Sequence, residues 1–408
     1  DANGRFVVPL PFLNNHQSET FPGSRQVALR RFQNLERKLL SDEMLYQAYK
    51  AFMLEYESLG HMSVAPSPGI YFIPHHPVFK GAITSSKIRV VFDASAVASS
   101  KLSLNQCLHT GPKLQQDIVD ILLRFRVHQF SFTADVCKMY RQVSVLPKYR
   151  AYQHIFWRAS PVDELREYEL NTVTYGLNCA PFLALRVLQD LAEQECAGLP
   201  DVLDALTYQT YVDDICVGAD TVDSLMKLRS DLQQVLSRAG LELKKWSSNA
   251  HQLLSSVPAA DRATDASPFN DTDIGLTKVL GLQWKSSQDT FGFDVQLSEA
   301  VPTKRAVLSV IARIFDPLGF LAPVIFLAKH HMQQIWKANL TWDEPLPKEL
   351  NNCWQAFVHG LPMLSEVRIP RFLNTYIQCQ VQLCGFCDAS ERGYAAVVYL
   401  RTLSPNNP

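Results

Sequence analysis

Two adjacent carboxylates, Asp213 and Asp214, lie between two short β-forming runs at residues 207–212 and 215–217. Runs rich in Tyr, Thr, Val and Ile around an Asp pair predict a tight hairpin, because Asp tolerates the left-handed backbone that such turns need. Neighbouring carboxylates repel each other unless a cation lies beside them, so a divalent metal ion would explain the pair. A solvated Asp-Asp turn is the alternative, and the hairpin alone favours it.

A third carboxylate, Asp135, ends the apolar segment 130–134, which predicts a buried strand. An isolated charge is costly there, whereas a metal ligand is common. Three carboxylates that one sheet brings together match nucleotidyl transfer. In that reaction two Mg²⁺ ions about 3.5 to 4 Å apart activate a primer 3′-hydroxyl and stabilise the leaving pyrophosphate, and Mn²⁺ is an alternative ion.

Two cations, Lys87 and Arg89, alternate with apolar residues in the predicted strand 87–93, which follows another predicted strand at 71–78. They would share one face with Asp93. Two cations on one strand face can hold a triphosphate, with Asp93 orienting one of them. A surface strand carrying ion pairs is about equally supported by the local sequence.

Several other patterns have a structural interpretation at least as strong as a functional one. His75 and His76 could bind a metal ion, but prolines on both sides mark a structural turn. Arg305 and Arg313 are eight residues apart on one helix edge, which suits contact with a nucleic-acid backbone, although solvation also explains them. The pair Cys384 and Cys387 has redox or zinc spacing without a second pair, so we interpret both as strand thiols.

The elements that must position these residues follow from apolar spacing. Strand, helix, hairpin, helix and strand succeed one another from residue 130 to 246. This order predicts an α+β layer with helices on one face of an antiparallel sheet and the other face free for substrate. Helices are predicted at 27–56, 112–125, 181–192, 223–236 and 303–315, and further strands at 151–158, 168–174, 278–284, 290–294, 381–390 and 393–399.

Composition limits the number of domains and the class of protein that the chain can be. The 408 residues, 47% hydrophobic, predict two to four folded domains, and a net charge of -1 gives no overall attraction to nucleic acid. Nine scattered cysteines suit reduced thiols in the cytoplasm. The longest apolar run, 318–328, contains a proline and is shorter than the ~20 residues of a membrane helix. We expect the chain to be a piece of a longer polypeptide.

Five motifs together resemble the reverse transcriptases, most closely those in polyproteins of BEL/Pao-class long-terminal-repeat retrotransposons. The resemblance covers nearly the whole chain and implies a right-hand polymerase with fingers, palm and thumb, an antiparallel palm sheet backed by helices, and a truncated ribonuclease H-like start. The motifs are Tyr-Val-Asp213-Asp214, Phe132-Thr-Ala-Asp135 with Tyr140, Tyr71-Phe-Ile-Pro-His-His-Pro, Arg89-Val-Val-Phe-Asp93-Ala-Ser and Ile311-Ala-Arg-Ile-Phe-Asp-Pro-Leu-Gly319.

This resemblance implies roles for the site residues. Asp135 and Asp213 correspond to the metal-binding pair, the Val136 carbonyl to a further ligand, and Asp214 to the third catalytic carboxylate. Tyr140 corresponds to the aromatic residue under the sugar, which favours deoxynucleotides. The other positions assigned to substrate are Lys87 and Arg89 for the triphosphate, Tyr175 and Gly176 where retroviral enzymes usually carry Gln-Gly, Tyr211, and Lys244 or Lys245 near the pyrophosphate.

The same resemblance divides the chain. It implies fingers and palm at 1–246 (palm core about 128–142 and 175–246), an insertion and primer-grip hairpin at 247–300, a thumb at 301–345, and a connection with an incomplete ribonuclease H-like domain at 346–408. Asp388 corresponds to the first ribonuclease H carboxylate, so we expect no ribonuclease H activity from this piece. Primer and template contacts are assigned to Gly281, Leu282, Gln283, Trp284, Arg305 and Arg313.

The prediction is therefore an RNA-directed DNA polymerase that uses Mg²⁺, deoxynucleoside triphosphates and an RNA or DNA template with a primer. Its other partner would be the rest of the retrotransposon polyprotein, and its location the cytoplasm, in retrotransposon particles. Tyr140 argues against an RNA polymerase of the same architecture. A decayed or repurposed copy that binds nucleic acid without chemistry is the alternative from another class.

Overall fold

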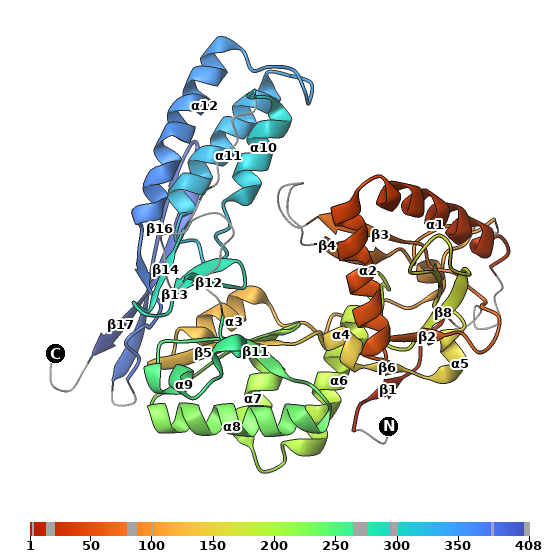
Figure 1. The fold of residues 1–408 in the computed structure, drawn as a ribbon. Helices are drawn as coiled ribbons and strands as arrows, with labels where there is room; N and C mark the ends of the chain where they lie inside the picture. The colour runs from red at the N-terminus through yellow and green to blue at the C-terminus, as the bar shows by residue number, and fades with distance from the viewer. Residues whose placement is uncertain are drawn as a thin grey trace. The chain divides into compact units, whose positions relative to one another are not determined.

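The computed structural model describes residues 1, 4–13, 21–79, 88–99, 101–263, 276–293, 295, 301–376 and 379–403. The α+β prediction is confirmed (Figure 1). The chain divides into two compact units. The first comprises Asp1–Gln115, Val136–Leu203 and Leu232–Glu242, and the second Gln116–Asp135, Asp204–Asp231 and Leu243–Pro408.

The first unit is built on two long helices and small sheets. Buried Ala28, Phe32, Leu35 and Leu39 recur at helical spacing along α1, which explains why this helix packs inward. β3 pairs with β4, and β2, β8 and β7 form a three-stranded sheet. The elements are β1 Val7–Val8, α1 Ser24–Leu40, α2 Glu43–Ser58, β2 Met62–Val64, β3 His75–Phe79, β4 Ile88–Phe92, η1 Leu104–Cys107, α4 Met139–Gln142, β6 Ser144–Val145, α5 Pro147–Arg150, β7 His154–Trp157, β8 Arg166–Leu170 and α6 Ala180–Glu195.

The second unit carries a four-stranded sheet in the order β11-β5-β10-β9, which we call the central sheet. Helix α3 packs on β10 and β9, with Ile121, Leu122 and Phe125 buried. Helices α7 and α8 each begin in one unit and end in the other along the chain. The elements are α3 Ile118–Phe125, β5 Phe130–Val136, α7 Pro200–Tyr208, β9 Thr210–Tyr211, β10 Asp214–Ala219, α8 Val222–Arg238, β11 Leu243–Ser248, α9 His251–Ser255 and η2 Ala259–Asp261.

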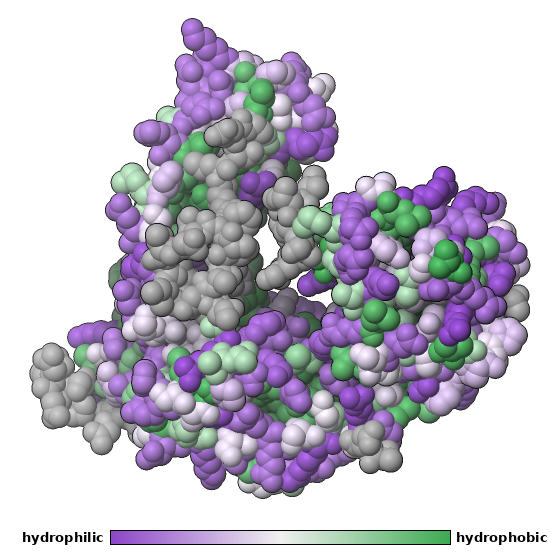
Figure 2. Space-filling view, in the orientation of Figure 1, coloured by the Kyte–Doolittle hydropathy of each residue, from purple (hydrophilic) through white to green (hydrophobic). Residues whose placement is uncertain are grey.

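A second sheet, helices and a long hairpin complete this unit. The strand order is β12-β13-β14-β15, and α11 packs between α10 and α12 (Figure 1). Figure 2 shows a face on which hydrophilic residues prevail and hydrophobic ones are scattered. The elements are β12 Leu276–Val279, β13 Leu282–Lys285, β14 Thr290–Gly292, α10 Lys304–Arg313, α11 Ala322–Lys337, α12 Lys348–Gly360, η3 Leu361–Glu366, β15 Ile369–Pro370, β16 Gln380–Ser390 and β17 Gly393–Leu403.

Several predicted boundaries are wrong. The strands expected over 151–158 and 168–174 are β7, His154–Trp157, and β8, Arg166–Leu170. Two other boundaries have a local physical cause. The helix expected from Pro112 begins only at Ile118, because the Asp117 side chain accepts a hydrogen bond from the Val119 amide at 3.0 Å and caps the helix there. The strand expected over 278–284 is broken at Leu280 and Gly281, whose φ angles of 49° and 92° make a turn between β12 and β13. Within the predicted insertion and primer-grip segment 247–300, residues 264–275, 294 and 296–300 lie outside the described residues.

Candidate active site

The central sheet brings two of the three predicted carboxylates face to face. β10 runs antiparallel to β5 in a register that pairs Asp214 with Asp135, followed by Ile215 with Ala134. Directly paired residues of an antiparallel sheet project their side chains from the same face, with Cβ atoms about 4.5 to 5.5 Å apart. Since most of β5 is buried, Asp135 and Asp214 stand at the end of a rigid strand pair.

The predicted hairpin is present, but its turn lies one residue earlier than expected. Tyr211 pairs with Asp214 across β9 and β10, so Val212 and Asp213 form the turn and Asp214 begins the strand. Val212, and not an Asp, takes the left-handed conformation, with φ of 53°. This conformation costs a β-branched residue about 1 to 3 kcal/mol, and the pairing of β10 with β5 imposes it.

The expected strand start at Thr207 is also wrong. Thr207 and Tyr208 end helix α7, which the sequence interpretation missed, and only Thr210 and Tyr211 form β9. The Tyr-Thr run has β propensity, but the local helix with buried Val202 and Ala205 overrides it.

One lysine of β11 joins the carboxylates. Lys245 Nζ lies 2.7 Å from Asp135 Oδ1. Lys244, its neighbour in the strand, instead donates to Asp261 Oδ1 at 2.9 Å, because successive strand residues point to opposite faces. The structure therefore brings Lys245 to the carboxylates and directs Lys244 away, where the sequence had left the choice open.

The charges of this cluster are coupled. Burial, then the charges of Asp213 and Asp135, raise the pKa of Asp214 to about 6, although Lys245 opposes the shift. Burial lowers the pKa of Lys245, but its hydrogen bond to Asp135 and the charges of all three carboxylates outweigh burial and raise it. Asp213 and Asp135 thus affect the ionisation of Asp214. We refer to Asp135, Asp213, Asp214 and Lys245 as the carboxylate cluster.

The donor set of the carboxylate cluster fits a hard divalent cation in its chemistry. It offers carboxylate oxygens, the ligands that Mg²⁺ takes. Burial first, and then repulsion from Asp213 and Asp135, raise the pKa of Asp214, and a cation would relieve that repulsion. Val136, the last residue of β5, directly follows Asp135 and carries the predicted carbonyl ligand. Within the described parts of the chain no three His, Cys, Asp or Glu side chains converge on a single metal position, and Lys245 provides the positive charge at Asp135.

In the first unit, the predicted sugar-contacting residue is paired with another predicted substrate residue. The rings of Tyr140, in α4, and Tyr175 are 5.1 Å apart between centroids at 82°. Gly176 has φ of 98°, and a Cβ there would lie 1.9 Å from the Phe92 carbonyl oxygen. Only glycine fits this position, so the backbone turn expected after Tyr175 is present.

The predicted triphosphate cations are only partly described. Arg89 is exposed on β4, opposite Val78, whereas Lys87 lies outside the described residues. The expectation that Asp93 orients one of them has no support, because Asp93 Oδ2 accepts a hydrogen bond from Arg31 Nη1 at 2.5 Å. Asp93 directly follows β4, which ends at Phe92. No local sequence pattern predicts its contact with Arg31, which lies far away in the chain.

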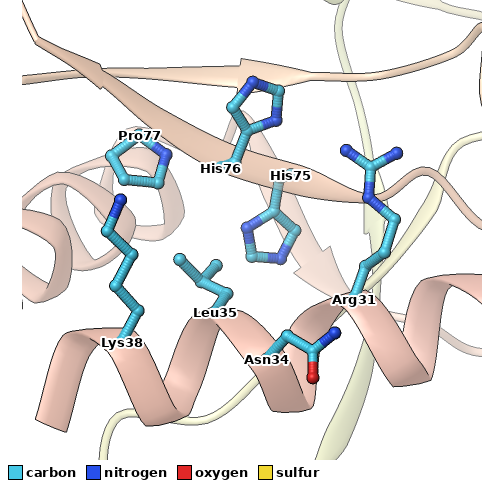
Figure 3. A pocket seen from close by; sticks show the side chains of 7 residues that line it. All are labelled: Arg31, Asn34, Leu35, Lys38, His75, His76 and Pro77. Atoms are coloured by element: carbon cyan, nitrogen blue, oxygen red, sulfur yellow. The ribbon is translucent and has the colours of Figure 1, made fainter.

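Figure 3 shows a pocket of about 320 Å³ between α1 and β3, lined by Arg31, Asn34, Leu35, Lys38, His75, His76 and Pro77. The His75 ring points towards α1 and is fully engaged, with Nδ1 2.5 Å from Tyr49 Oη and Nε2 2.9 Å from the Phe156 oxygen. Burial lowers its pKa to about 4, so His75 is a neutral core histidine. The prediction of a structural turn at His75 and His76 is wrong, because both residues lie in strand β3 and pair with β4.

The predicted primer and template residues divide into buried and exposed ones. Leu282 and Trp284 are core residues, and Trp284 Nε1 donates to Asp289 Oδ1 at 3.0 Å. Gln283 points to the other face of β13 and is half-buried, and Gly281 lies in the turn before it. Lastly, Arg305 binds Asp343 through two hydrogen bonds of 2.7 and 3.1 Å, Arg313 donates to Ser309 Oγ at 3.3 Å, and Asp388 is exposed on β16.

Sequence reasoning missed Arg371, which fixes the start of β5. Its guanidinium is fully buried and donates to the carbonyl oxygens of Phe125, His128 and Gln129 at 2.5 to 2.9 Å. It also binds the Asp289 carboxylate at 2.6 and 2.8 Å. No local signal marks this arginine, because arginine in a loop is usually exposed.

Part of the chain matches a known protein family, and its fold is similar to that of a solved structure. Residues 303–408 match the family described as the Pao retrotransposon-like RNaseH-like domain. The fold is similar to the solved structure of a foamy viral protease-reverse transcriptase dRH in complex with double-stranded DNA, with a TM-score of 0.56 and 14% identity. The resemblance to BEL/Pao reverse transcriptases is confirmed. The match covers 84% of this chain and 54% of the foamy viral chain, so the chain spans about half the length of that protein.

Two negative results complete the comparison. No curated protein matches the sequence. Of the helices in the described segments, none combines the length and the apolar character that crossing a membrane requires.

Proposed function

We propose that this protein is an RNA-directed DNA polymerase of a BEL/Pao retrotransposon. The observation that carries the proposal is the register of β10 on β5, which places Asp214 opposite Asp135 and the turn residue Asp213 beside them. Three carboxylates on a rigid sheet edge with one lysine are the parts that nucleotidyl transfer needs.

Each member of the carboxylate cluster has a role in this proposal. Asp135 and Asp213 would hold Mg²⁺ with the Val136 carbonyl, and Asp214 would add negative charge that strengthens ion binding. The ions supply Lewis acidity to the primer 3′-hydroxyl and the leaving pyrophosphate. Lys245, which donates a hydrogen bond to Asp135, would offer its positive charge to the anionic pyrophosphate.

The substrate residues follow the same proposal. The Tyr140 ring would lie under the sugar and exclude a 2′-hydroxyl, which makes deoxynucleoside triphosphates the preferred substrate. Arg89 is exposed and available to a triphosphate, with Lys87 as the second cation. Tyr211, next to the turn, pairs with Asp214 in the sheet and would contact the substrate.

The elements can be assigned to the domains of a polymerase in this proposal. The central sheet would be the palm, α1, α2 and β3–β4 the fingers, α10 and α11 the thumb, and β13–β14 the primer grip, with a ribonuclease H-like region after them. The solved foamy viral protein is described in complex with double-stranded DNA. That likeness supports a template with a primer as the partner here, with the half-buried Gln283 and the exposed Arg313 as contact residues.

Primer extension tests the proposal. Purified protein with Mg²⁺, an RNA template, a labelled DNA primer and deoxynucleoside triphosphates should lengthen the primer. Asp213→Asn should abolish extension, whereas Asp223→Asn, which changes an exposed carboxylate in the first turn of α8, should not. Binding of template and primer without extension under Mg²⁺ or Mn²⁺ would instead establish a nucleic-acid-binding copy without chemistry.

A further inference from the structure

The residue that stands where retroviral enzymes usually carry glutamine is an aromatic one here, and it contacts the proposed sugar-contacting ring. Tyr175 meets Tyr140 edge to face, with 5.1 Å between the ring centroids and 82° between the ring planes. This arrangement suits the charge distribution of two aromatic rings and fixes their relative orientation. A glutamine side chain would offer hydrogen bonds but no such wall.

Arg141, directly after Tyr140, holds the other side of Tyr175. Its guanidinium carbon lies 5.5 Å from the Tyr175 ring centroid, 4.8 Å from that of Tyr56 and 5.1 Å from that of Phe52. All three distances are within the range of cation–π attraction. Arg141 Nε is buried and has no hydrogen-bond partner among the described residues, while three aromatic rings lie close to the guanidinium carbon.

The backbone next to Tyr175 is restrained, whereas Tyr140 lies in a very short helix. Gly176 is packed so closely against the Phe92 carbonyl that no side chain fits, which fixes the chain directly after Tyr175. Tyr140 belongs to α4, a helix of four residues whose N-cap residue, Lys138, provides no side-chain cap. Such a short helix does not by itself fix the Tyr140 ring, so the restraint has to come from its neighbours.

We infer that Tyr175 is a positioning residue that sets the sugar selectivity of the site by holding the Tyr140 ring, and that Arg141 holds Tyr175 in turn. The inference rests on the proposed polymerase function, and it extends that function from Tyr140 to a group of five side chains: Phe52, Tyr56, Tyr140, Arg141 and Tyr175. Rejection of a 2′-hydroxyl depends on a clash, and a small displacement of the ring relieves a clash.

The test compares deoxy- and ribonucleotides in single-nucleotide primer extension and takes the ratio of their kcat/KM values. Tyr175→Gln should lower this ratio about 2- to 10-fold, the range expected for loss of an edge-to-face pair. Tyr175→Phe keeps the ring and should retain the ratio within twofold. Arg141→Gln should shift the ratio in the same direction as Tyr175→Gln.

A second set of variants distinguishes the loss of ring positioning from a general loss of activity. In a Tyr140→Ala background, Tyr175→Gln should leave the ratio unchanged, because the ring that it positions is gone. Retention of the wild-type ratio by Tyr175→Gln, or an equal loss in both backgrounds, would overturn the inference. If the unmodified protein extends no primer, the proposed function fails. The contact is then tested by a double-mutant cycle on urea unfolding, in which less than twofold coupling between Tyr140 and Tyr175 in the folding constant overturns the inference.

Discussion

Asp214→Asn should stabilise the metal-free protein at neutral pH, although it removes a residue of the proposed site. Burial and the charges of Asp213 and Asp135 raise the pKa of Asp214 from 3.8 to about 6. The folded state therefore binds the proton more tightly than the unfolded state does. Ionising Asp214 opposes folding, and an amide of the same shape removes that cost.

The size and pH dependence of the effect follow from the shift. Moving a pKa from 3.8 to about 6 corresponds to about 3 kcal/mol, and screening of this partly exposed group leaves about 1 to 3 kcal/mol. The pKa of Asp214 is higher in the folded state than in the unfolded state. The free energy of unfolding of the wild-type protein therefore falls by this amount as pH rises from about 4 to about 6. The advantage of Asp214→Asn should be full above about pH 7, fall by about half near pH 5, and vanish below about pH 4.

Urea unfolding with a metal chelator, followed by tryptophan fluorescence at several pH values, measures this difference. Every tryptophan except Trp157 lies in the same compact unit as Asp214, so the signal reports chiefly on that unit. Asp223→Asn, at an exposed carboxylate, is the matched control and should show no pH-dependent gain. Equal stability of Asp214→Asn and wild type at pH 7.5, or a loss in the variant, would refute the reasoning.

Three further predictions test other contacts. Lys245→Met should lower primer extension about 100-fold, while Lys244→Met, which removes a partner of Asp261, should lower it far less. Single-turnover extension rates measure both effects, and equal losses would contradict the assignment of Lys245 to the carboxylate cluster. Gly176→Ala should destabilise the first unit by more than about 2 kcal/mol in urea unfolding, since its Cβ would meet the Phe92 carbonyl; an unchanged midpoint would contradict this. Arg371→Met should cost about 3 to 5 kcal/mol, because the half-buried Asp289 carboxylate and three carbonyl groups lose the donor that the buried Arg371 provides. A wild-type unfolding midpoint would exclude that role.

Patterns that are local in the sequence predicted the structure well. The apolar run before Asp135 forms β5, and helical spacing gave α1, α2, α6 and α8 within a few residues. The acid at the strand end and the Asp pair in a hairpin were visible because strand composition and turn composition differ sharply. For the same reason the three carboxylates were candidates before their geometry was known.

Features that depend on distant pairing were not predictable. The turn moved to Val212 because the register with β5 draws Asp214 into the strand, and no residue near Val212 specifies that register. The Arg31 partner of Asp93 and the carbonyl partners of Arg371 are likewise far away in the sequence. Lys244 and Lys245 could be separated only once the face of β11 was known.

The central claim is that the carboxylate cluster carries out templated DNA synthesis, and one measurement tests it most directly. Extension of a labelled DNA primer on an RNA template is followed in Mg²⁺ for the wild type and Asp213→Asn, with template–primer affinity measured in parallel by fluorescence anisotropy. We predict template-directed extension by the wild type, and none by Asp213→Asn despite unchanged binding. Equal extension by both proteins would contradict the account.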